Sequence, residues 1–185
     1  MSAAPSGTDR FPPPRSLMAA FMIRSHQRSH EIETRHSPEP TERPTRDAAD
    51  LRSLRILLAE DDEQMRLLLA WSLKSEGFEV IHCEDGMELL DALSRTIADG
   101  EADRLALIIS DIRMPGISGL DLLRGLRHSE AFPPMILITA FGDEETHAEA
   151  ERLGAAAMFD KPFEIRHLVA RVHEILDDPH GKKPQ

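Results

Sequence analysis

The chain has 185 residues, 41% of them hydrophobic and 30% charged, which is typical of a globular protein. Its formal net charge is −11, and because residues 1–50 hold seven basic and seven acidic side chains, residues 51–185 carry all of that charge. An acidic body argues against non-specific nucleic-acid binding by the folded part.

The apolar runs and the single cysteine indicate the compartment. No run approaches the roughly 18 apolar residues of a membrane helix, and residues 17–23 are not followed by a cleavage pattern of small residues. Cys83 excludes an internal disulfide and fits a reducing environment, as a small residue just past a strand or, alternatively, as a reactive thiol. We therefore expect a cytoplasmic protein that does not contact a membrane.

Residues 1–52 are predicted to be a disordered tail rich in Pro, Arg and His. Seven prolines interrupt any helix, and no apolar period emerges between them, so the segment cannot bury enough surface to order itself. We expect one domain over residues 53–177 and a short polar tail over residues 178–185.

Apolar strands and amphipathic helices alternate along the predicted domain. Strands are expected at residues 55–59, 78–82, 105–109, 135–139 and 155–160. Helices are expected at residues 63–75, 86–97, 120–128, 143–153 and 164–176. The first helix carries apolar residues at helical spacing, Met65, Leu68, Leu69 and Leu73, with Trp71 alongside. Strict alternation predicts parallel strands with right-handed helical crossovers, hence a three-layer αβα sandwich.

Asp111 lies at the end of the third strand. Five apolar residues, 105–109, precede Ser110 and Asp111, and Met114-Pro115-Gly116 then forces a loop. The carboxyl edge of an open α/β sheet is where ligands bind, so Asp111 is a candidate functional residue. The alternative is that Asp111 caps the following helix.

Polar residues also follow three other strands. Glu60-Asp61 follows the first, Thr139 ends the fourth and Lys161 follows the fifth, so all should meet Asp111 at one edge. Three carboxylates there require a cation, and oxygen ligands favour Mg²⁺. With a hydroxyl and an ammonium as anion donors, the set suits phosphoryl transfer to Asp111. Singly, these residues are equally explained as helix caps, an ordinary strand residue and a surface charge.

Four segments, ILLAEDDEQMR, LIISDIRMPGISGLDLLRGLR, ILITAFG and FDKPF, resemble in order and spacing the receiver domain of bacterial two-component response regulators. The resemblance covers residues 54–176. It implies a flavodoxin-like, doubly wound α/β fold with a five-stranded parallel sheet in the order 2-1-3-4-5 and five helices.

The resemblance also implies roles for individual residues. Asp111 matches the phosphoacceptor, and the implied Mg²⁺ ligands are Glu60, Asp61, Asp111 and the backbone carbonyl of Arg113. Asp62, just after the acidic pair, is a weaker candidate ligand.

Four further positions match the family pattern or depart from it. Thr139 matches the switch hydroxyl, Lys161 the phosphate-binding lysine and Pro162 the proline that follows a cis peptide. The switch position on the fifth strand is Met158 where receivers carry an aromatic residue, and the neighbouring Phe159 should face the other side of the strand. The usual rotamer switch has no aromatic ring at this position, and the alternative is that Met158 itself moves inward when Thr139 is drawn to the phosphate.

By this resemblance the chain is a signalling switch rather than an enzyme, catalysing only its own phosphoryl transfer and slow autodephosphorylation. The implied phosphodonor is a sensor histidine kinase or a histidine phosphotransfer protein. An unknown downstream protein should bind the face made by the fourth helix, fifth strand and fifth helix. Since nine residues follow the last helix, we expect no direct DNA binding, and a single-domain regulator or phosphorelay intermediate.

Three rival interpretations remain. A haloacid-dehalogenase-type phosphohydrolase would need an Asp-x-Asp motif after the first strand, whereas Asp111 follows the third and Arg113 occupies the second Asp position. A flavodoxin-like cofactor binder would need a phosphate-cradling loop where Glu60-Asp61 stands. A degenerate receiver would lack part of the acceptor set that is present here.

Overall fold

The structure is a computed structural model that describes residues 54–126 and 132–177. The two tails expected at residues 1–52 and 178–185 lie outside these residues, as does the end of the helix expected at 120–128. The described chain alternates strands and helices from Arg55 to Asp177, as the sequence predicts.

Half of the observed bounds coincide with the expected ones, and the others differ by one or two residues. The strands are β1 (Arg55–Ala59), β2 (Glu79–Cys83), β3 (Leu105–Asp111), β4 (Met135–Thr139) and β5 (Ala157–Asp160). The helices are α3 (Glu63–Ser75), α4 (Gly86–Ala98), the 3-10 helix η1 (Ala102–Arg104), α5 (Gly119–Leu126), α6 (Glu144–Leu153) and α7 (Ile165–Asp177). β5 starts two residues later than expected because the amide of Ala155 still closes the end of α6 through the carbonyl of Ala150.

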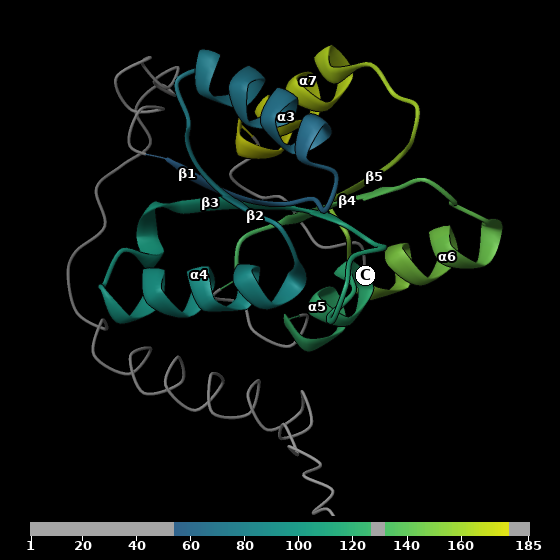
Figure 1. Cartoon of the computed structure of the whole chain (residues 1–185), viewed down its shortest axis with the longest axis horizontal. Helices are drawn as coiled ribbons and strands as arrows, with labels where there is room; N and C mark the ends of the chain where they lie inside the picture. The colour runs from purple at the N-terminus through teal and green to yellow at the C-terminus, as the bar shows by residue number, and fades with distance from the viewer. Residues whose placement is uncertain (1–53, 127–131, 178–185) are drawn as a thin grey trace, which may run out of the picture. The chain divides into compact units, whose positions relative to one another are not determined.

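The five strands form one parallel sheet in the order β2-β1-β3-β4-β5, which confirms the predicted topology. Helices α3 and α7 cover one face of the sheet, and α4, α5 and α6 cover the other (Figure 1). The order places β1 beside β3 and aligns Ala59 with Ser110. The residues that follow β1 therefore emerge next to the end of β3.

The core follows from nearly continuous apolar strands. Every residue of β1 and β4 is buried, as is every residue of β3 except Ala106. On the face covered by α3 and α7, one cluster joins strand residues such as Ile56, Ile109 and Ile138 to helix residues such as Leu69. This rigid centre holds the loops at the carboxyl edge.

The apolar residues of helix α3 are divided between its inner and outer sides. Leu69 and Leu73 are buried, whereas Leu68 is 49% exposed. Arg66 points inward instead and is 6% exposed. Positions 66, 69 and 73 share one face of the helix at a spacing of 3.6 residues, and this is the face that packs on the sheet.

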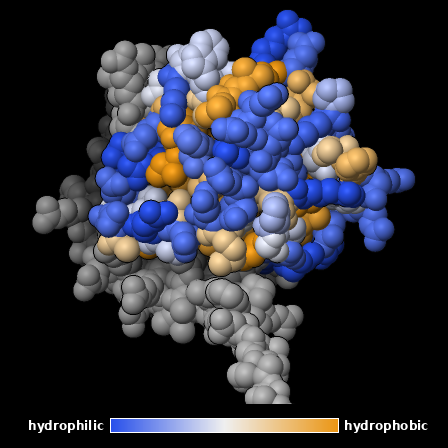
Figure 2. Space-filling view, in the orientation of Figure 1, coloured by the Kyte–Doolittle hydropathy of each residue, from blue (hydrophilic) through white to orange (hydrophobic). Residues whose placement is uncertain are grey.

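The surface in view is largely hydrophilic, with apolar atoms gathered over α3 (Figure 2). The exposed outer side of α3 carries Leu67, Leu68 and Trp71. Within the described ranges, no helix combines the length and hydropathy that a membrane span requires.

Candidate functional site

Three carboxylates from two neighbouring strands meet at the carboxyl edge of the sheet. Glu60 and Asp61 follow β1, and Asp111 is the last residue of β3. One oxygen from each of the three lies within 4.8 Å of the other two. The sheet order produces this cluster, because β1 and β3 run parallel as neighbours and end at the same level.

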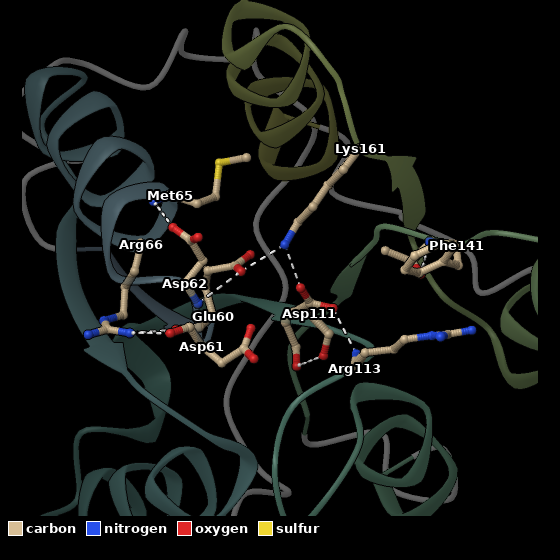
Figure 3. Close-up of polar contacts among 11 residues, drawn as sticks. Glu60, Asp61, Asp62, Met65, Arg66, Asp111, Arg113, Phe141 and Lys161 are labelled. Atoms are coloured by element: carbon tan, nitrogen blue, oxygen red, sulfur yellow. Dashed lines mark hydrogen bonds and ion pairs between the residues drawn. The ribbon is translucent and has the colours of Figure 1, made fainter.

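Lys161, the first residue after β5, lies between two of these carboxylates (Figure 3). Its Nζ donates to Oε1 of Glu60 at 2.7 Å and to Oδ2 of Asp111 at 2.5 Å. Glu60 is fully buried, Asp111 is 3% exposed and Asp61 is exposed. Three carboxylates thus face a single ammonium, which leaves the cluster formally negative.

Burial and charge shift the ionisation of this group in opposite directions. Burial raises the pKa of Glu60, and the charge of Asp111 adds to that effect, while the hydrogen bond from Lys161 opposes it. Burial by itself would lower the pKa of Lys161, but its hydrogen bonds to Asp111 and Glu60 outweigh burial and raise that pKa. Lys161 is therefore held firmly as an ammonium.

The carboxylate cluster fits a divalent cation. Among the described residues, Oε2 of Glu60 is a buried side-chain oxygen without a hydrogen-bond partner. A buried acceptor left unpaired is costly, and an excess of carboxylate oxygens around it is the donor set that Mg²⁺ binds. Glu60, Asp61 and Asp111 are the side chains that would hold such an ion.

The remaining oxygen of Asp111 is fixed by its own loop. Oδ1 accepts the backbone N–H of Arg113 at 2.7 Å. The guanidinium of Arg113 extends away from Asp111 and lies 4.7 Å from the centroid of the Phe141 ring (Figure 3). The loops after β3 and β4 are thereby joined at the surface by a cation–π contact.

Thr139 ends β4 beside Asp111. In the pairing of β3 with β4, Asp111 aligns with Ile138, so Thr139 is the next residue along. Thr139 is fully buried, and its hydroxyl oxygen accepts the N–H of Phe141 at 3.2 Å. Lys161 is tied to the same residue, since its backbone N–H donates to the Thr139 carbonyl at 2.7 Å.

The alternative roles as helix caps are filled by other residues. Asp62 caps α3, accepting the N–H of Met65 at 2.8 Å, so Glu60 and Asp61 are not needed for that purpose. Helix α5 begins eight residues after Asp111, and the hydroxyl of Ser118 accepts the N–H of Asp121 in its first turn. The acidic residues of the cluster are thus left available for ligand binding.

Gly119 explains how the start of α5 approaches Asp111 so closely. A Cβ at this position would lie 2.5 Å from the backbone carbonyl oxygen of Asp111. That distance is far inside van der Waals contact, and the obstacle is backbone that cannot rotate away. A side chain here would displace the loop that follows Asp111.

Sequence reasoning missed Arg66. Its guanidinium, almost fully buried under α3, donates to the carbonyl of Glu60 at 2.7 Å and pairs with Glu84 at 3.1 Å. It thus holds the backbone from which the acidic pair projects. The available signal was its helical phase, because position 66 shares the inward face of α3 with Leu69 and Leu73.

Residues at and beside β5 complete the site. Met158 is half-buried, and Phe159, on the opposite side of the strand, packs against Phe163 with ring centroids 5.4 Å apart. The peptide bond between Lys161 and Pro162 is cis. Away from the site, burial raises the pKa of Cys83 to about 12, which makes a reactive thiol there chemically unfavourable.

Comparisons with known proteins agree with this geometry. The family model of the response regulator receiver domain matches residues 56–173. The transcriptional regulatory protein CpxR of Escherichia coli (strain K12) is 37% identical over 131 residues, which cover 71% of this chain and 53% of CpxR. The transcriptional regulatory protein FixJ of Bradyrhizobium diazoefficiens is 33% identical over 121 residues, covering 65% of this chain and 56% of FixJ.

A solved structure gives the same result for the fold. The chemotaxis response regulator CheY4 of Vibrio cholerae matches with a TM-score of 0.57 at 26% identity, over 66% of this chain and 98% of CheY4. The chain spans about half the length of the curated relatives it matches. Because the family match extends over most of the chain and over every strand of the sheet, this chain belongs to the family of response regulator receiver domains.

Proposed function

We propose that this chain is a phosphorylation-dependent switch in two-component signalling, accepting a phosphoryl group on Asp111. The observation that carries the proposal is the cluster of two buried carboxylates, Glu60 and Asp111, with the exposed Asp61, which faces the single ammonium of Lys161 and leaves one oxygen of Glu60 unpaired. Such a site is incomplete without a cation and has donors ready for an anion.

Each residue has a definite part in the proposed transfer. Asp111 is the nucleophile, and its carboxylate is oriented by the Arg113 amide and by Lys161. Mg²⁺, when bound, would neutralise charge on the transferred oxygens. Lys161 and the Thr139 hydroxyl supply donors to the new phosphoryl group, and Arg66 keeps the acidic pair in place.

The proposed donor is the phosphohistidine of a sensor histidine kinase or of a histidine phosphotransfer protein. The chain would act on its own phosphoryl group only, by uptake and slow loss, and would not turn over external phosphate esters. We place this reaction in the cytoplasm, where a single, buried, unreactive cysteine is compatible with reducing conditions.

The proposed output is a change in the face formed by α6, β5 and α7, read by a downstream protein. The negative charge of the phosphoryl group attracts the Thr139 hydroxyl and the Lys161 ammonium, and the elements attached to these two residues move with them. CpxR and FixJ are named transcriptional regulatory proteins. For this chain we propose protein binding rather than DNA binding, because residues 51–185 carry the net charge of −11.

Intact-mass measurement after incubation with acetyl phosphate tests the proposal. The full chain should gain the mass of one phosphoryl group when Mg²⁺ is present and none when it is chelated. Asp111→Asn should abolish the gain. Asp62→Asn is the matched control, because it makes the same carboxylate-to-amide change one residue beyond the acidic pair and Asn still caps a helix.

Three outcomes would overturn the proposal. The first is no label on the wild-type chain, as a degenerate receiver would give, and the second is a label that survives Asp111→Asn. The third is steady release of phosphate from an external ester, which would favour a phosphohydrolase. Retention of a DNA duplex by the full chain at moderate salt would overturn the output assignment alone.

A further inference from the structure

Helix α6 is anchored more lightly than its neighbour α5. Of the ten residues of α6, two are buried, Ala150 and Leu153, whereas half of the eight residues of α5 are buried. A helix with little buried apolar area depends on polar contacts for its position and is more readily displaced. The polar contacts of α6 therefore decide where it rests.

One of these contacts lies near the start of α6 and reaches the end of β5. Nε2 of His147 is 3.0 Å from Oδ1 and 2.9 Å from Oδ2 of Asp160, so the ring meets both oxygens of the carboxylate. Asp160 is the residue immediately before Lys161. The His147–Asp160 pair thus ties α6 to the residue next to the phosphate-binding lysine.

The pair also encloses the loop that follows Thr139. A Cβ on Gly142 would lie 2.0 Å from Oδ1 of Asp160 and 2.6 Å from Nε2 of His147. Asp160 aligns with Thr139 in the pairing of β4 with β5. The backbone of Gly142 therefore has no free space beneath the pair, and a shift of the loop over residues 140–142 must move the pair with it.

We propose that the His147–Asp160 pair is a latch that holds the start of α6 against the end of β5 until Asp111 is phosphorylated. The release step rests on the proposed function. A phosphoryl group on Asp111 attracts the Thr139 hydroxyl and the Lys161 ammonium. Lys161 directly follows Asp160, and Thr139 begins the loop whose residue Gly142 lies against the latch. Their displacement parts His147 from Asp160 and frees the start of α6.

The latch occupies the place where an aromatic switch would act. Side chains alternate along a strand, so Met158 and Asp160 share one face of β5, opposite to Phe159, which packs with the cluster beneath α3 and α7. Met158 offers no ring to turn inward. The contact of Asp160 with His147 gives β5 a direct connection to α6 on that face.

Hydrogen exchange of the α6 amides in the unphosphorylated full chain tests the latch itself. His147→Ala should raise exchange in α6 about two- to fivefold, the range expected for one partly exposed pair. His167→Ala is the matched control, since it makes the same His-to-Ala change on α7, which covers the face of the sheet opposite to α6 (Figure 1). Equal α6 exchange in His147→Ala, His167→Ala and wild type would overturn the latch.

Gly142→Ala gives an independent test by steric means. The added methyl group meets the ends of two flexible side chains, so it should push His147 and Asp160 apart while leaving the backbone in place. It should raise α6 exchange as His147→Ala does, and the double variant should show less than the product of the two effects. Fully independent effects would contradict a shared contact.

The release step is tested with acetyl phosphate and Mg²⁺, with phosphorylation confirmed by intact mass. Phosphorylation should raise α6 exchange in wild type and add little in His147→Ala. Unchanged hydrogen exchange of the α6 amides in fully phosphorylated wild type would overturn the proposed release of the latch. Absence of any label would overturn the proposed function and the release step with it, whereas the latch is judged by the unphosphorylated samples.

Discussion

The two edges of the β-sheet hold charged side chains in opposite ways. At the amino ends of β1 and β2, Arg55 contacts Glu79 at 2.7 Å and Glu101 at 2.6 Å, and Arg104 contacts the same two glutamates. Two cations thus meet two carboxylates. At the carboxyl edge, Lys161 pairs with Glu60 and Asp111, while Asp61 lies beside them in the same cluster.

The difference separates a balanced charge network from one that carries an excess of negative charge. Balanced pairs at the amino edge satisfy their hydrogen bonds and hold the strand ends together. The carboxyl edge keeps a formal excess of negative charge and an unpaired oxygen on Glu60. This excess costs stability, which the proposed binding of a cation and an anion would offset, and four substitutions distinguish the two edges.

Lys161→Ala should have the largest effect on stability. It removes the ammonium from between two carboxylates that are almost fully buried, and breaking a buried pair in this way costs about 3 kcal/mol. Urea unfolding should show the loss in chelator and a partial recovery in Mg²⁺. Lys74→Ala, at an exposed position of α3, should change stability by less than about 0.5 kcal/mol. A small loss that Mg²⁺ does not alter would contradict an uncompensated acidic cluster.

Arg55→Met should destabilise the amino edge, by about 2 kcal/mol, because hydrogen bonds to charged groups are lost from a side chain that is 10% exposed. Glu79 and Glu101 are partly exposed and regain water, which keeps the cost below that at Lys161. Unlike that of Lys161→Ala, the free energy of unfolding of this variant should change with Mg²⁺ by the same amount as that of wild type. Arg95→Met, on the exposed side of α4, serves as the control in the same urea titration.

Asp61→Asn should change stability in the opposite sense. Removing one exposed carboxylate relieves repulsion with Glu60 and Asp111, so in chelator the free energy of unfolding should rise by about 0.5 kcal/mol. In saturating Mg²⁺ the order should reverse, because wild type retains the additional ligand. Asp91→Asn, on the exposed side of α4, should show neither change. Lower stability of Asp61→Asn in chelator would show that the cluster is not strained by its charge.

Glu101→Gln should have the smallest effect, and that effect should depend on pH. The hydrogen bond from Arg55 lowers the pKa of Glu101 below its ordinary value. A depressed carboxyl pKa contributes stability above the unfolded pKa of about 4.3, and that contribution is lost as the pH falls through the folded pKa. Urea unfolding should therefore give Glu101→Gln a lower free energy of unfolding than wild type at pH 7, and the two values should converge in acid. A difference in the free energy of unfolding that stays constant into acid would exclude the charged contact with Arg55 as its cause.

Much of the candidate site could be predicted because parallel strands share one edge. Once residues 55–59 and 105–109 are identified as buried parallel strands, Glu60, Asp61 and Asp111 must follow their ends. The structure places them in one cluster for that reason. The approach of Lys161 to Glu60 depends in addition on the strand order, since these residues are 101 positions apart in the chain.

The sequence by itself determined the alternation of strands and helices, the parallel sheet and the residues at its carboxyl edge, because hydrophobic period and strand ends are local properties. Only the tertiary structure decided that Arg66 is buried while Leu68 is exposed, since the face of α3 that packs on the sheet depends on the contacts of the helix within the fold. It alone also brought His147 to Asp160, because a contact between partly exposed side chains leaves no periodic pattern in the sequence.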